Sequence, residues 1–257
     1  MITLSSAELN AWIAAFLWPL TRILGLIATA PLFGNLSIPA RVKVGLGVML
    51  TLVIAPTVPA MPAADPMSFA GLLIVIQQLV IGLSMGFAMR IVFAAVEMAG
   101  EISGLTMGFG FATFFDPQTR ARTSAIAQFL ALLTLMLFLA LDIHLMLLAT
   151  LAESFKTLPI SGMPVGAGGF RQIASWGGLI FTAGVQLALP IIGVLLITNI
   201  ALGVLTRAAP QLNLFGIGFP VTLTAGFVVL GLVIPYLATP LERLFHEGLA
   251  IVAKLAS

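Results

Sequence analysis

Residues 131–141 read ALLTLMLFLAL, and they belong to a longer stretch, Thr123–Leu141, that contains no charged side chain. Transmembrane β-strands alternate polar and apolar residues over about ten positions, and this stretch does not alternate. A helix of about 20 apolar residues can cross the roughly 30 Å hydrocarbon core of a bilayer. The stretch therefore predicts a membrane-spanning helix.

Other parts of the chain repeat this pattern. Four further uncharged runs are longer still, and a sixth stretch is apolar except for Arg22: Val44–Ala64, Pro66–Met89, Gln172–Thr206, Ala208–Leu241 and Leu9–Phe33. Charged residues make up 8% of the 257 residues and hydrophobic residues 60%, whereas soluble domains carry about 25% charged residues. Composition thus predicts an all-α membrane protein with about six long apolar helices in hairpins.

Proline and glycine punctuation gives approximate helix bounds. We expect helices over Glu8–Ala30, Val44–Ile54, Ser124–Ala152, Leu179–Thr206 and Leu214–Ala238, a loop over Ser154–Trp176 and a short amphipathic tail from Pro240. Ser5 and Glu8 fit a capping box at the first helix. The segment Phe69–Thr106 contains no proline and is too long for one bilayer crossing, so it either breaks near a glycine or projects beyond the membrane.

The sequence lacks the residues that several kinds of functional site require. The chain has no cysteine, so it has no disulfide, thiolate catalyst or cysteine metal site. Its net charge is +2 and no basic run occurs, which argues against a nucleic-acid partner. We therefore expect no cofactor, no metal, no nucleic acid and no enzymatic activity.

One face of the overlong segment gathers its charges and small residues. At about 100° per residue around the helix axis, six residues lie on this face: Arg90, Glu97, Gly100, Glu101, Gly104 and Gly108. Glycines spaced four apart allow helices to approach closely in membranes. Two interpretations stay open: a stripe that packs against helices of the same chain, or a polar stripe that faces a water-filled path or a partner subunit.

An aromatic cluster follows that face. Large apolar side chains crowd the stretch MGFGFATFF at Met107, Phe109, Phe111, Phe114 and Phe115, and Asp116-Pro117 then ends any helix. Non-helical backbone inside a membrane protein must be buried or line a cavity. A ring of Phe and Met can close a pore by excluding water. We interpret residues 106–122 as a plug loop, with an ordinary aromatic turn at the membrane interface as the alternative.

Two weaker patterns suggest other functions. Gly82–Gly86 matches the G-x-S-x-G motif of serine hydrolases, but a chance match is expected in a glycine-rich helix. Asp142 and His144, with Arg90 and Glu97, could form the site of a secondary transporter. We see no two-fold hydropathy symmetry, which transporters built from inverted repeats show.

Basic residues and turns mark the loops. Five polar residues are candidates for cytoplasmic-side or partner-contact loops: Arg41, Lys43, Arg207, Gln211 and Asn213. The distribution of Lys and Arg favours the loops of Arg41, Lys43 and Arg207 as cytoplasmic and both termini as outside. Taken alone, the loop that begins at Arg207 is an ordinary turn between two helices.

Four stretches together resemble the FliR/SctT family of type III secretion export-gate components. They are RILGLIATAPLFGNLSIPARVK (22–43), EMAGEISGLTMGFGFATFFDPQ (97–118), NIALGVLTR (199–207) and PQLNLFGIGFP (210–220). They are spread over nearly the whole chain, and the last is more similar to the flagellar branch than to the injectisome branch.

The resemblance implies a structural subunit of the flagellar gate for unfolded export substrates, in the inner membrane at the basal body. It implies FliP, FliQ, FlhB and other basal-body components as partners, besides membrane lipid. It also implies a FliP-like part (1–178) followed by a FliQ-like hairpin with a short tail (179–257), and a loop near Met107–Phe115 across the channel. An injectisome subunit is the alternative within the family.

Overall fold

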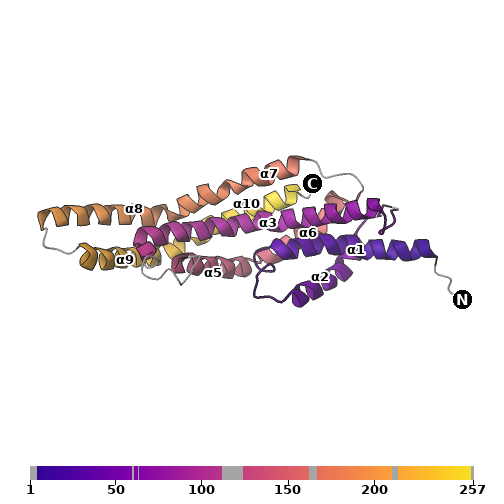
Figure 1. Cartoon of the computed structure of the whole chain (residues 1–257), viewed down its shortest axis with the longest axis horizontal. Helices are drawn as coiled ribbons and strands as arrows, with labels where there is room; N and C mark the ends of the chain where they lie inside the picture. The colour runs from indigo at the N-terminus through magenta and orange to yellow at the C-terminus, as the bar shows by residue number, and fades with distance from the viewer. Residues whose placement is uncertain are drawn as a thin grey trace. The chain divides into compact units, whose positions relative to one another are not determined.

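The computed structural model describes residues 5–59, 61–62, 64–111, 124–161, 167–209 and 214–255. These residues form helices α1 (Ser6–Thr29), α2 (Ala40–Ile54), α3 (Phe69–Met107), α5 (Ala125–Ala140), α6 (Ile143–Thr157), α7 (Ala167–Gly177), α8 (Leu179–Ala208), α9 (Leu214–Val233) and α10 (Ala238–Leu255), with three short 3₁₀ turns. No strand occurs among the described residues. The predicted all-α membrane fold is therefore confirmed (Figure 1).

Five helical segments of the described chain are long and apolar enough to cross a membrane: Glu8–Thr29, Ala40–Thr57, Phe69–Met107, Arg171–Ala208 and Gly216–Leu255. The pair α5 and α6 forms a sixth if it is counted as one span bent by 65°. This agrees with the expected number of spans. The capping box is also confirmed, because Ser5 Oγ accepts the Glu8 amide and the Glu8 carboxylate accepts the Ser5 amide at 2.9 Å.

The overlong segment does not break. Helix α3 runs for 39 residues without interruption, about 58 Å at ~1.5 Å per residue. It is thus nearly twice as long as the roughly 30 Å hydrocarbon core requires. Figure 1 shows α3 as one continuous ribbon.

Two expected elements were wrong. The single helix expected over Ser124–Ala152 is two helices, because Asp142 adopts a left-handed conformation (φ 54°) that interrupts the backbone ladder. The loop expected over Ser154–Trp176 contains α7, whose Trp176 Nε1 donates a hydrogen bond of 3.0 Å to the Ala88 carbonyl of α3. A tertiary contact here stabilises a helix that its glycines disfavour.

The chain divides into two compact units that are not consecutive in sequence. The first unit comprises residues 1–91, 138–177 and 245–257, and the second comprises 92–137 and 178–244. The proposed division at residue 178 into FliP-like and FliQ-like parts concerns the order along the chain and stays a prediction.

The first unit is built on close helix packing. Helix α1 packs against α2, and it lies so close to α3 that a Cβ on Gly25 would come within 2.8 Å of the Leu79 carbonyl oxygen. Gly82 and Gly86 face the α1 backbone from the other side of this contact, at Arg22 and at Leu26–Ala30. The G-x-S-x-G match is thus a helix-packing motif within α3, unlike the strand-to-helix turn that positions the serine of a hydrolase.

The second unit contains the α8–α9 hairpin, which Figure 1 shows as two neighbouring helices. Its core lies where α3, α5, α8 and α9 meet, around Ala99, Leu130, Ile191 and Leu230. Much of the hairpin's other surface is apolar and exposed, as at Leu189, Ile197, Val204, Val228 and Leu232.

Candidate functional site

The predicted plug begins where α3 ends. The helix stops at Met107 because Gly108 has a φ of 98°, a conformation that side chains with a Cβ rarely adopt. The Gly108 amide donates to the Leu105 carbonyl at 3.1 Å and closes the last turn. A short 3₁₀ turn, Phe109–Phe111, follows directly. The glycine thus redirects the chain, so that Gly108 lies beyond the helical part of the predicted stripe.

The first two residues of the predicted plug, Met107 and Phe109, contact α9. Met107 is fully buried, and a Cβ at Gly226 would lie 2.8 Å from its Cε atom. The ring of Phe109 meets the ring of Phe227 edge-to-face, with centroids 6.1 Å apart. Such pairs add about 0.5–1.5 kcal/mol beyond the burial of their area. The backbone of Phe111 is described, whereas Phe114, Phe115 and the rest of residues 112–123 lie outside the described residues.

The glycines of the polar stripe contact the start of α5. A Cβ on Gly100 would collide with the Ala127 backbone, and one on Gly104 would lie 2.9 Å from Ser124 Oγ. The Glu101 carboxylate accepts the Ser124 amide at 2.7 Å. This part of the stripe therefore joins two helices of the same unit.

Other stripe residues are more accessible. Arg90 is exposed and lines a hollow of about 460 Å³ with Phe87 and residues of the α1–α2 connection. Glu97 is half-buried. The stripe thus consists of a closely packed portion at its C-terminal end and a more open portion at Arg90.

The predicted loop residues lie at helix ends. Arg41 is exposed in the first turn of α2, and Lys43 Nζ donates to the Gly34 carbonyl at 3.1 Å. Arg207 is exposed in the last turn of α8, where a cation interacts favourably with the helix dipole. Gln211 and Asn213 lie outside the described residues.

Sequence reasoning noticed Arg22 but missed its environment. The side chain is fully buried in the first unit, and its Nε donates to Gln78 Oε1 at 2.7 Å. Its Nη1 donates to the Ser154 carbonyl at 2.9 Å and to Ser154 Oγ at 3.1 Å, and Nη2 donates to the Leu158 carbonyl at 2.9 Å. The guanidinium therefore joins α1, α3 and the C-terminal end of α6.

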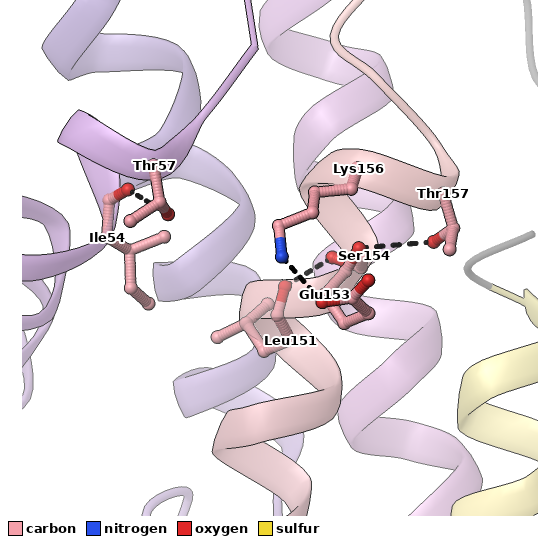
Figure 2. A network of polar contacts seen from close by, with 7 residues as sticks. All are labelled: Ile54, Thr57, Leu151, Glu153, Ser154, Lys156 and Thr157. Carbon is pink, nitrogen blue, oxygen red and sulfur yellow. Dashed lines mark hydrogen bonds and ion pairs between the residues drawn. The ribbon is translucent and has the colours of Figure 1, made fainter.

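Figure 2 shows this end of α6 with its local polar contacts. Ser154 Oγ donates to the Leu151 carbonyl, and Lys156 Nζ lies 3.0 Å from Glu153 Oε2 on the exposed side. A buried cation at a helix C-terminus is favourable because the free carbonyls carry partial negative charge. The signal available in the sequence was one arginine in an otherwise apolar span.

The candidate transporter residues are differently placed. Asp142 is exposed at the break between α5 and α6, and His144 is the second residue of α6 and lies beside Phe138, at a ring-centroid distance of 6.3 Å. The break therefore gives Asp142 a conformational role, and the aromatic neighbour gives His144 a packing role.

Comparison with known proteins decides the family. The family described as "Bacterial export proteins, family 1" matches residues 13–248. The chain belongs to this family. Among its relatives, the flagellar biosynthetic protein FliR of Pectobacterium carotovorum is 47% identical over 255 residues, covering 99% of this chain and 97% of that protein. FliR of Escherichia coli is 44% identical over 257 residues, covering 100% and 98%. FliR of Bacillus subtilis is 29% identical over 219 residues, covering 84% of each chain.

As a bacterial export protein of family 1, the chain is a membrane protein of an export apparatus. Its FliR relatives are named for flagellar biosynthesis, and the sequence similarity covers both units, including Met107 at the end of α3. The resemblance inferred from four short stretches is thereby confirmed.

Proposed function

We propose that the chain is a structural subunit of the flagellar type III protein-export gate. In this role it forms, with FliP and FliQ, the channel through which unfolded flagellar proteins leave the cytoplasm. The observation that carries the proposal is the full-length similarity to FliR proteins, 47% over 99% of the chain. The site of action is the inner membrane at the flagellar basal body, and FlhB would contact the cytoplasmic entrance.

The long helix supports a gate subunit over a protein that is surrounded by lipid alone. About 58 Å of continuous helix exceeds a roughly 30 Å hydrocarbon core. Much of α3 is buried within this chain, but Phe69, Leu72 and Phe87 are exposed and need another apolar surface to cover them. Neighbouring subunits would provide that surface. Arg41, Lys43 and Arg207 are candidate contacts for cytoplasmic-side partners because they are basic and lie at helix ends.

The α8–α9 hairpin supports an assembly as well. Few residues of its two spans are buried, although both are strongly apolar. We propose that residues 179–257 are the FliQ-like part, which packs beside FliQ, and that residues 1–178 are the FliP-like part. An apolar helix face beside another such face buries the surface that this chain leaves open.

Met107 and Phe109 are proposed to begin the closure of the channel. A narrow apolar constriction excludes ions because water and charge lose their solvation inside it. The two side chains lie at a glycine turn and are held by α9, so they are placed firmly next to a bend in the backbone. Phe111, Phe114 and Phe115 complete the proposed closure in the sequence.

Co-purification tests the proposal. The chain should be tagged and extracted in mild detergent from cells that express FliP, FliQ and the chain together. The proposal expects all three proteins in one complex of constant composition. If the chain purifies without FliP and FliQ while it remains folded, the gate function is wrong and a self-contained transporter becomes the better account.

A further inference from the structure

The start of α5 is capped by the side chain of Ser124, which directly precedes the helix, and by that of Glu101 from α3. Ser124 precedes the helix, and its Oγ accepts the Ala127 amide at 3.1 Å, which is the ordinary role of an N-cap serine. The amide of Ser124 itself donates to Glu101 Oε1 of α3 at 2.7 Å. Ser124 Oγ also lies 3.3 Å from the Gly100 carbonyl, to which it donates.

This arrangement is a capping box with one member replaced. In a capping box, an acid three residues after the N-cap accepts the amide of the N-cap residue. That position in α5 is Ala127, which has no acceptor. Glu101, 23 residues earlier in the chain, supplies the missing acceptor. Its carboxylate also places negative charge at the positive end of α5.

The contact needs the glycines of α3. Side chains at positions 100 and 104 would separate the two helices, because their Cβ atoms would collide with Ala127 and Ser124. Glycine at both positions brings the α5 terminus within reach of the Glu101 carboxylate. The apolar contacts of Met107 and Phe109 with α9 lie at the same end of α3. The end of α3 is thus held by α9 through apolar contacts and by α5 through a polar one.

We infer that Glu101 is a positioning residue, whose carboxylate fixes the start of α5 to the last turns of α3 and thereby holds Ser124 in place relative to Met107. The inference rests on the proposed function, because both of its tests use the assembled complex with FliP and FliQ. The role requires a side chain at position 101 that is long enough to bring a hydrogen-bond acceptor to the Ser124 amide. Glutamine therefore fulfils it, whereas alanine removes it and aspartate is one methylene too short.

Hydrogen exchange of the assembled complex with FliP and FliQ tests the contact itself. In Glu101→Ala, amides in the first turn of α5 should exchange about fivefold faster than in the wild type, because an N-cap partner is lost. Glu101→Gln should exchange at nearly the wild-type rate. Thr106→Val is the matched control, since the Thr106 hydroxyl donates to Ser103 within its own helix. Equal exchange in the alanine variant and the wild type would overturn the inference.

Ion conductance then tests the positioning role. Membranes containing Glu101→Ala complexes should leak several-fold more than the wild type, and Glu101→Gln should restore tightness. Leakage by the glutamine variant as large as that of alanine would overturn the hydrogen-bond role. If alanine prevents assembly, Glu101→Asp is measured instead and should leak. If both fail to assemble while glutamine assembles, Glu101 is needed for the fold and the positioning role is wrong. Failure of the wild-type chain to bind FliP and FliQ would instead refute the proposed function.

Discussion

The guanidinium of Arg22 lies over the ring of Phe155, with its Cζ atom 4.4 Å from the ring centroid, and no part of Arg22 is exposed. Cation–π contacts of this kind are worth more when they are removed from water. Together with the bonds to Gln78, Ser154 and Leu158, this contact makes one side chain the polar centre of the first unit.

Replacing Arg22 should therefore destabilise the first unit. Arg22→Leu leaves the oxygens of Gln78, Ser154 and Leu158 buried without this donor, and we expect a loss of about 3 kcal/mol or more. Arg22→Lys should be only partly better, because an ammonium lacks the planar fork that reaches three partners. The measurement is the thermal midpoint of the purified complex. Arg171→Leu, an exposed arginine of α7, is the control, and equal midpoints for the two leucine variants would contradict the account.

A larger side chain at position 104 should disrupt the close contact between α3 and the start of α5. Gly104→Leu forces the side chain against Ser124, where a Cβ alone would already lie 2.9 Å from Oγ. We expect loss of the assembled complex on co-purification with FliP and FliQ. Leu105→Ala, next along the chain but 63% exposed, should be tolerated. Similar yields of complex from both variants would mean that the helices do not need this close approach.

The chain expressed alone should be degraded or poorly ordered. Its α8–α9 hairpin exposes large apolar side chains such as Phe181, Leu196 and Phe227, and surfaces of this extent mark interaction sites. Co-expression with FliP and FliQ should lengthen its lifetime, because binding stabilises the folded state. Pulse-chase labelling measures that lifetime. A long-lived, protease-resistant monomer would count strongly against a gate subunit.

Polar replacements in the aromatic cluster should make the membrane leak without preventing assembly. Phe109, Phe111 and Phe114 replaced together by serine lose the apolar closure, so ion conductance should rise while export continues at some level. The assembled complex must first be verified by co-purification. Tight membranes with a normal amount of mutant complex would place the closure elsewhere and leave these aromatics as an interfacial turn.

Apolar run length and glycine spacing predicted most of the fold. The extent of the apolar segment that forms α3 and the α8–α9 hairpin follow from local sequence, which leaves open whether α3 is continuous. The break at Asp142 did not, because neither proline nor glycine marks it and the strain lies in one backbone angle. Helix α7 was missed because Trp176 is anchored by a residue 88 positions away.

Some features of the candidate site could likewise be predicted from the sequence, and others could not. The shared face of Gly100 and Gly104 has a signal in the sequence because helical periodicity is local, whereas Gly108 lies beyond the end of α3. The partners of Arg22 and Glu101 could not, since hydrogen bonds between residues 132 and 23 positions apart depend on how the helices pack. A single charge in an apolar span indicates that a partner is needed but does not identify it.

Photo-crosslinking tests most directly whether the chain lines an export channel. A photoreactive amino acid at Phe109 should be combined with an export substrate arrested in transit, in cells that contain the whole assembly. The account predicts a crosslink between position 109 and the substrate. The same probe at Leu189, on the exposed face of α8, should capture neighbouring subunits or lipid but no substrate. An arrested substrate that crosslinks at neither position, or at Leu189 alone, would contradict the account.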